Sequence, residues 1–197
     1  MWIFIVVFLI VGCGQNRHLA DAWPASIASI SGFSQGEQTE LVEALAELNA
    51  GVGQTILTPT PAGEAYPIHF QLVDDFEGHP LRAGFATRSA DQCVIRISRE
   101  VFDESKKPFF LSVVIHEVGH CGGLRHVTDE GEIMYTSSVP FSHYGVDARE
   151  RFFRDLLTST GLDGSTPTAA TAWKTTFSSA GEWPAGEVLK GLGLRYY

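Results

Sequence analysis

The chain has 197 residues, a formal net charge of −9 at pH 7 and a hydrophobic content of 44%. This hydrophobic content supports an ordinary core, and the length fits one domain once a short leader is removed. The acidic balance argues against nucleic acid as a partner, because a phosphate backbone attracts cationic surfaces.

The first 13 residues, MWIFIVVFLIVGC, are almost wholly apolar but too short to cross a bilayer as a helix, which needs about 20 residues. They are typical of the apolar part of a signal peptide. The end, from Ile10 to Cys13, resembles a bacterial lipobox, so we expect a lipid on Cys13. Gly14 is compatible with sorting to the outer membrane. No Lys or Arg precedes Arg17, which leaves open a secretory signal cut elsewhere or a start site assigned too late.

The elements after this leader alternate between strand and helix patterns. Residues 25–30 are a candidate first strand. Leu41, Leu45 and Leu48 recur at helical spacing and predict a helix near residues 36–49, which begins after Ser34 or Gln35 and is closed by Gly51. Period-two alternation and turn residues then predict strands over residues 54–58, 68–73, 81–87 and 93–98.

The motif around which the chain is organised is H-E-x-x-H-x-x-G-x-x-H, present as HEVGHCGGLRH at residues 116–126. The apolar run before it, preceded by Pro108, predicts a buried helix on which His116 and His120 project from one face. Zn²⁺ accepts imidazole nitrogens at about 2.0–2.1 Å in a tetrahedral shell, which suits two ligands one turn apart. Gly123 can take positive φ and end the helix, so that His126 returns to the same ion. An amphipathic helix with merely polar histidines would leave Gly123 and His126 unexplained.

Glu117 follows His116 but is turned about 100° around the helix axis, so it flanks the metal rather than binding it. Three protein ligands leave a fourth position for water, whose pKa the metal lowers to about 7. Glu117 can then act as general base towards that water and as general acid towards the leaving amine. The pattern therefore predicts amide hydrolysis without a covalent intermediate.

A second marker is Met134, which lies eight residues beyond His126 in the segment GEIMY. Together with the long three-histidine motif, it makes the chain resemble the metzincins, which are zinc peptidases with a methionine-containing turn beneath the metal. The resemblance gives Met134 a structural role as a packing residue and not as a ligand.

Within the metzincins, residues 126–135 are most similar to matrixins. Asp129 and Gly131 stand at positions that recur there, whereas Val127 departs from the usual serine. Thr136 stands where astacins and serralysins carry a tyrosine, so we assign no tyrosine to the metal.

The resemblance implies a zincin-like α+β fold, with a twisted mixed sheet, an active-site helix and a C-terminal helix. It implies that residues 81–87 form the strand beside the cleft, where Ala83, Gly84 and Phe85 would pair with an extended substrate. The pattern alone leaves an ordinary internal strand as the alternative. Residues 135–141 would form the wall of the pocket for the side chain just after the scissile bond.

The turn after residue 73 carries acidic residues and a histidine, namely Asp74, Asp75, Glu77 and His79. Matrixins bind structural calcium and a second zinc in a comparable loop. The further histidines and the glycine-rich run of that loop are missing, so we expect one catalytic Zn²⁺ and no structural Ca²⁺ or second Zn²⁺.

The state of the two remaining cysteines depends on the redox compartment. Export would leave Cys93 and Cys121 in an oxidising space after Cys13 is modified. Cys121 follows His120 and points away from the metal, and in the resembling fold Cys93 begins a strand under that helix. The two residues either form a disulfide or stay as two buried thiols.

After the pocket wall, Asp147 is expected to cap a helix that runs to about Thr158 and ends at Gly161 and Gly164. We therefore divide the chain into a signal peptide of lipoprotein type (1–12), a tether (13–25), a metzincin-like catalytic domain (26–160) and a C-terminal extension of unknown role (161–197).

We expect a monomeric zinc endopeptidase that cleaves peptides or proteins. It would be exported to the bacterial cell envelope and anchored in the membrane through its N-terminal lipid, as an outer-membrane or periplasmic lipoprotein, with secretion as the alternative. Two other functions stay open: a processing peptidase or aminopeptidase of narrow specificity, and a lipid-anchored zinc-fold binding or structural module without peptidase activity.

Overall fold

The structure is a computed structural model that describes residues 23–58, 65–79 and 81–162. The predicted signal peptide, Cys13, Gly164 and nearly all of the C-terminal extension lie outside these ranges. The described part begins inside the predicted tether, where Trp23 and Ala25 are buried in the core. None of the helices in the described ranges combines the length and the hydropathy that a membrane crossing requires.

The core of the domain is a five-stranded sheet with the order β2-β1-β3-β5-β4. Its strands are β1 (Ala25–Ser31), β2 (Leu57–Thr58), β3 (Pro67–Val73), β4 (Gly84–Arg88) and β5 (Cys93–Ser98). The first three and β5 run parallel, and β4 pairs antiparallel with β5. β4 therefore lies at an edge of the sheet, as the resemblance implied, although it begins at Gly84 rather than at Leu81.

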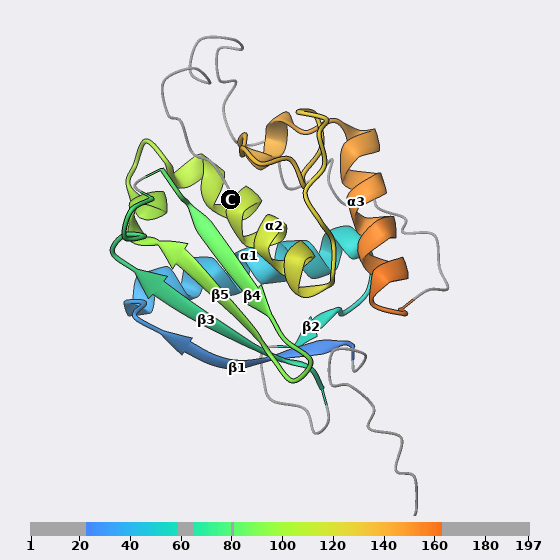
Figure 1. The fold of residues 1–197 in the computed structure, drawn as a ribbon, viewed down its shortest axis with the longest axis horizontal. Coiled ribbons are helices and arrows are strands. Elements are labelled where there is room, and N and C mark those ends of the chain that lie inside the picture. The colour runs from blue at the N-terminus through green and yellow to red at the C-terminus, as the bar shows by residue number, and fades with distance from the viewer. Residues whose placement is uncertain (1–22, 59–64, 80, 163–197) are drawn as a thin grey trace, which may run out of the picture.

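Three α-helices accompany the sheet, namely α1 (Gln35–Val52), α2 (Phe110–Cys121) and α3 (Val146–Ser159). In Figure 1, α1 and α2 lie behind the strands and α3 stands to their right. Short 3₁₀ turns, η2 (Arg99–Phe102), η3 (Lys107–Phe109) and η4 (Phe141–His143), complete the described elements. This mixed sheet with helices confirms the predicted α+β fold.

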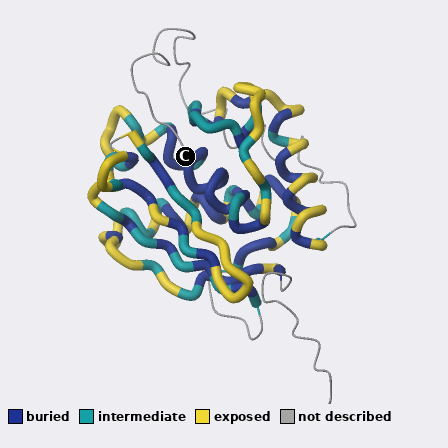
Figure 2. Tube along the Cα trace, viewed as in Figure 1, coloured by how far each residue is buried: buried dark blue, intermediate teal, exposed yellow. Residues whose placement is uncertain are grey.

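The alternation of β3 shows which face of the sheet is covered. Ile68, Phe70 and Leu72 are buried, whereas His69 and Gln71 on the other face are half-exposed. Almost every residue of α2 is buried as well, and in Figure 2 this helix forms a dark centre within the domain. The metal-binding motif is thus carried by a helix that is packed on several sides, which fixes its position.

The start of α1 is fixed by a reciprocal pair of hydrogen bonds between its N-cap and its first turn. Ser34 and Glu37 form a capping box, in which Ser34 Oγ accepts from the Glu37 N–H and Glu37 Oε2 accepts from the Ser34 N–H. Glu37 also pairs with Arg99 from the turn after β5, at 2.7 Å. The cap therefore connects the start of α1 to the sheet.

Two predicted helix boundaries were wrong. Gly51 does not end α1, because the apolar stripe continues to Val52, which is only 2% exposed, and the chain reverses at Gly53 with a φ of 77°. Asp147 does not cap α3, because Gly145 is the N-cap and Asp147 already lies in the first helical turn. An acidic side chain is still favourable there, next to the positive end of the helix dipole.

Replacing Ser34 with alanine is expected to lower the free energy of unfolding by about 1 kcal/mol, because the Glu37 N–H loses its acceptor. Chemical denaturation measures this difference. Ser142→Ala, an exposed serine in η4, is the matched control and should change stability by less than about 0.5 kcal/mol. Equal changes in the two variants would contradict the role of the cap.

Candidate metal centre

The metal helix α2 ends in a turn that is built from backbone hydrogen bonds. The N–H of Gly123 donates to the carbonyl of His120 and the N–H of Leu124 donates to that of Gly119, both at 2.9 Å. This pattern is the Schellman motif, which requires a residue with positive φ after the helix. Gly123 has a φ of 94°, as predicted. The chain therefore turns back towards α2 immediately after its last residue.

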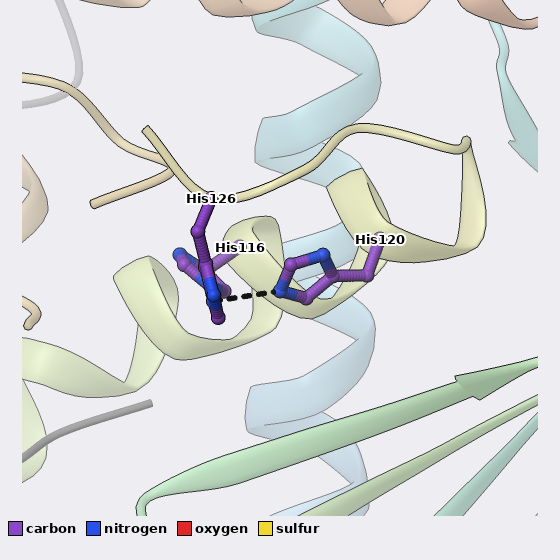
Figure 3. A group of neighbouring side chains, drawn as sticks. All are labelled: His116, His120 and His126. Atoms are coloured by element: carbon purple, nitrogen blue, oxygen red, sulfur yellow. Dashed lines mark hydrogen bonds between the residues drawn. The ribbon is translucent and has the colours of Figure 1, made fainter. Parts of the chain in front are cut away.

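The turn brings the three histidines of the motif together (Figure 3). His126 Nε2 lies 3.2 Å from His116 Nε2 and 3.1 Å from His120 Nε2. Two ligands of a tetrahedral ion with bonds of about 2.05 Å lie roughly 3.3 Å apart, so the spacing fits a zinc ion. Within the described residues, these histidines are the one group of His, Cys, Asp and Glu side chains close enough to share a metal.

Backbone carbonyls set the tautomer of two of these imidazoles. His116 Nδ1 lies 2.7 Å from the carbonyl oxygen of Ile133, and His120 Nδ1 lies 2.9 Å from that of Leu124. A carbonyl oxygen can only accept, so each Nδ1 carries the proton and each Nε2 keeps its lone pair. Lone pairs that point at one another from neutral rings are the donor set that a metal ion needs.

The electrostatic environment keeps the rings neutral. Burial lowers the pKa of His116 well below its usual value, and the neighbouring His120 lowers it further. Burial also lowers the pKa values of His120 and His126, in the latter case together with the effect of His120. Neutral imidazole is the metal-binding form, so this pocket favours a cation over protons at neutral pH.

Glu117 is buried between α2 and the edge strand β4. Its side chain is 1% exposed, and a Cβ built on Gly84 would lie 2.6 Å from its Oε1. Burial raises the pKa of Glu117 to about 8, against the opposing effects of a hydrogen bond from the Ala86 backbone and of Arg82. Its Oε2 is buried and accepts no hydrogen bond from the described residues. The carboxyl group thus has one anchored and one unused oxygen next to His116.

Met134 packs against the metal helix at Gly119. A Cβ built on Gly119 would lie 2.7 Å from Met134 Sδ and 2.9 Å from Phe152 Cε2 of α3. The Met134 carbonyl accepts from the Val127 N–H at 3.0 Å. Met134 therefore contacts the helix between its two histidines and also fixes the residue that follows His126.

Comparison with known proteins agrees with this geometry. A family model described as Matrixin matches residues 14–148, which include the whole motif and the methionine turn. The chain belongs to the matrixin family. This family membership and the three-histidine cluster support a zinc metallopeptidase. No curated protein and no solved structure gives a significant match to the chain.

In this matrixin, Cys93 and Cys121 form a disulfide, with their Cα atoms 5.7 Å apart. Both residues are fully buried. Of the two alternatives that the sequence left open, the structure therefore contains the bridge.

Ala83, Gly84 and Phe85, which were expected to contact substrate, differ in how far they are buried. Ala83 is fully buried, and its carbonyl accepts from the Ser98 N–H of β5 at 2.9 Å. Gly84 is also buried, and the space next to its Cα holds Glu117 and Val113. Phe85 is half-exposed, with the Arg82 guanidinium 4.8 Å from its ring centre. The missing side chain of Gly84 therefore leaves room for the Glu117 carboxyl group.

The segment expected to form the pocket wall, residues 135–141, is tied to the metal helix. Ser112 Oγ of α2 donates to the carbonyl of Val139 at 2.6 Å, and the Tyr144 hydroxyl accepts from the Val139 N–H at 3.4 Å. In the acidic turn after β3, Asp74 pairs with Arg99 at 3.1 Å.

The backbone partners of the site were not predicted from the sequence. The carbonyls of Ile133 and Leu124 and the N–H of Ala86 hold functional side chains, but their residue types carry no sign of this role. Arg88, whose side chain lies over Gly123, was also missed. The only available signal was its position at the end of the edge strand.

Gly119→Ala is expected to destabilise the domain, although alanine normally stabilises a helix by roughly 0.5–1 kcal/mol relative to glycine. The new Cβ would overlap Met134 and Phe152, and overpacking typically costs about 1–3 kcal/mol. Gly36→Ala in α1 is the control, because a Cβ at Gly36 has nothing within 4 Å. Thermal unfolding should show a lower Tm for the first variant only, and a stabilised Gly119→Ala would contradict the packing.

Proposed function

We propose that this matrixin is a zinc-dependent endopeptidase in which His116, His120 and His126 hold the ion and Glu117 transfers the proton. The observation that carries the proposal is the buried Oε2 of Glu117, which has no hydrogen-bond partner among the described residues and belongs to the residue next to His116. A buried unpaired carboxylate oxygen is costly, and such groups are typical of catalytic sites.

When bound, zinc acts as a Lewis acid towards water and towards a peptide carbonyl. The histidines supply three neutral nitrogens, held in place by the carbonyls of Ile133 and Leu124. A bound cation would favour the ionised carboxylate of Glu117 over the protonated form that burial favours. The carboxylate then takes a proton from the attacking water on Oε2 and returns that proton to the amine that leaves. The Ala86 backbone holds the carboxyl group meanwhile, so the proton is received and delivered from one position.

The edge strand β4 supports a mode of substrate binding. Ala83 directs its carbonyl to β5, and backbone groups alternate sides along an antiparallel strand, so Gly84 and Ala86 direct theirs outward. The Ala86 N–H is used by Glu117. We infer that the carbonyls of Gly84 and Ala86 and the N–H of Gly84 pair with an extended peptide, and that Phe85 contacts it less directly than predicted.

Glu117→Gln is expected to lower peptidase activity by about 10²- to 10⁴-fold, because glutamine has nearly the same shape but cannot accept the proton. Zinc content should stay unchanged, since Glu117 is not among the three clustered histidines. Cleavage of an unfolded protein and of a mixed peptide library measures activity, and metal analysis measures zinc.

The matched control is Glu150→Gln, an exposed glutamate on α3 that should leave activity unchanged. Equal activity of Glu117→Gln and the wild type would rule out the mechanism. A wild-type protein that holds zinc but cleaves nothing in the library would favour the binding module, and cleavage confined to peptide N-termini would favour an aminopeptidase.

We also propose that the protein is exported and anchored through a lipid on Cys13. The apolar residues 1–12 and the lipobox-like segment that ends at Cys13 support this location, as does the disulfide, because disulfides persist in oxidising compartments.

Intact-mass measurement of the membrane fraction tests the anchor. The account expects a mature chain that begins at Cys13 and carries the mass of acyl chains, and expects Cys13→Ser to lose the lipid and leave the membrane fraction. An unmodified chain recovered in the soluble fraction would contradict the lipoprotein and favour secretion.

A further inference from the structure

We propose that the Cys93–Cys121 disulfide and Arg88 position the zinc ligands, so that zinc affinity depends on the oxidation state of the two cysteines. This inference rests on the proposed zinc site. It concerns one cross-strand pair, because Arg88 of β4 stands directly opposite Cys93 of β5 in the ladder. We call Arg88, Cys93 and Cys121 the clasp.

The first contact of the clasp is covalent. Cys121 is the last residue of α2 and follows His120 directly, and its disulfide joins this end of the helix to the first residue of β5. Helix ends fray most easily because their last carbonyls lack partners within the helix. The bridge therefore holds the part of α2 that would otherwise move first, one residue from a zinc ligand.

The second contact is made by the guanidinium of Arg88. A Cβ built on Gly123 would lie 2.9 Å from Arg88 Nη1, so this group packs over the residue at which the chain reverses. The end of α2 and its turn are thus held at two nearby residues. The disulfide from β5 holds Cys121, and the Arg88 side chain from β4 packs against Gly123.

The held turn fixes two of the three ligands. Its next residue, Leu124, provides the carbonyl that accepts from His120 Nδ1 at 2.9 Å and thereby sets which nitrogen of His120 faces the centre. His126 follows two residues later, and its Nε2 lies 3.1 Å from that of His120. If this turn shifted, the Leu124 carbonyl that orients His120 and the imidazole of His126 would move together.

The hairpin that carries Arg88 and Cys93 is itself well anchored. The hydroxyl of Tyr66 is buried under its tip and lies 2.8 Å from the carbonyl oxygen of Ser89 and 2.6 Å from that of Gln92. The Ser89 N–H also donates to the Gln92 carbonyl at 2.9 Å. Arg88 and Cys93 flank this tip, so both residues stand on an anchored hairpin.

The chemistry of the coupling is thiol–disulfide exchange. A disulfide oxidant accepts two electrons and two protons as the thiols of Cys93 and Cys121 form their S–S bond, and a dithiol reductant reverses the step. Zinc binding and disulfide formation both depend on the position of the same turn, so each should favour the other. Zinc should therefore bind the oxidised protein more tightly than the reduced one. The centre would then form fully only in an oxidising compartment.

The test compares zinc dissociation constants, measured by competition with a chromogenic chelator, for the oxidised wild type and for Cys93→Ala/Cys121→Ala. Loss of a group that orients metal ligands typically weakens binding by about 10- to 100-fold, and that is the expected change. The control is Leu57→Ala in β2, a buried residue at the opposite edge of the sheet, which should lower stability without changing zinc affinity.

Arg88→Met provides a second variant with the disulfide intact and only an exposed side chain altered. It should weaken zinc binding about tenfold. Zinc affinity equal to wild type in a folded double variant would overturn the inference; if the double variant does not fold, unchanged affinity in Arg88→Met would overturn it. Failure of the oxidised wild type to bind zinc at all would instead overturn the zinc site.

Discussion

Two hydrogen bonds from imidazole Nδ1 groups to backbone carbonyls determine the arrangement of the candidate metal centre. Ile133 holds His116 and Leu124 holds His120, and both carbonyls belong to segments that follow the metal helix in the chain. Because a carbonyl cannot donate, these contacts turn the unprotonated Nε2 atoms towards His126. The centre therefore exists only where the chain has turned back at Gly123 and the methionine turn has packed under α2.

The packing around α2 explains how the histidines are held in position. On one side, Gly84 brings β4 so close that a Cβ would lie 2.6 Å from Glu117 Oε1. On the other side, Gly119 admits Met134 and Phe152, at a cost in helix propensity of roughly 0.5–1 kcal/mol. The helix is thus held between the sheet and the C-terminal segment, and small shifts of any ligand are resisted by contacts on both sides.

Residue types and their spacing predicted much of the site and the general fold. The i, i+4 spacing of His116 and His120 and the glycine at 123 predicted that three imidazoles come together, because helix geometry is regular. The edge position of β4 came from resemblance, since period-two alternation is the same in an edge and an internal strand. What could not be predicted depends on tertiary contacts: the end of α1 at Gly53 follows the burial of Val52, and the partners of the histidines are backbone carbonyls.

The central claim is that three imidazoles hold one zinc ion, and X-ray absorption at the zinc edge of the purified protein tests it most directly. The account predicts three imidazole nitrogens at about 2.0–2.1 Å with one further oxygen ligand, and the loss of one imidazole in His126→Ala. A spectrum with sulfur ligands, or one that His126→Ala leaves unchanged, would contradict the arrangement of the centre.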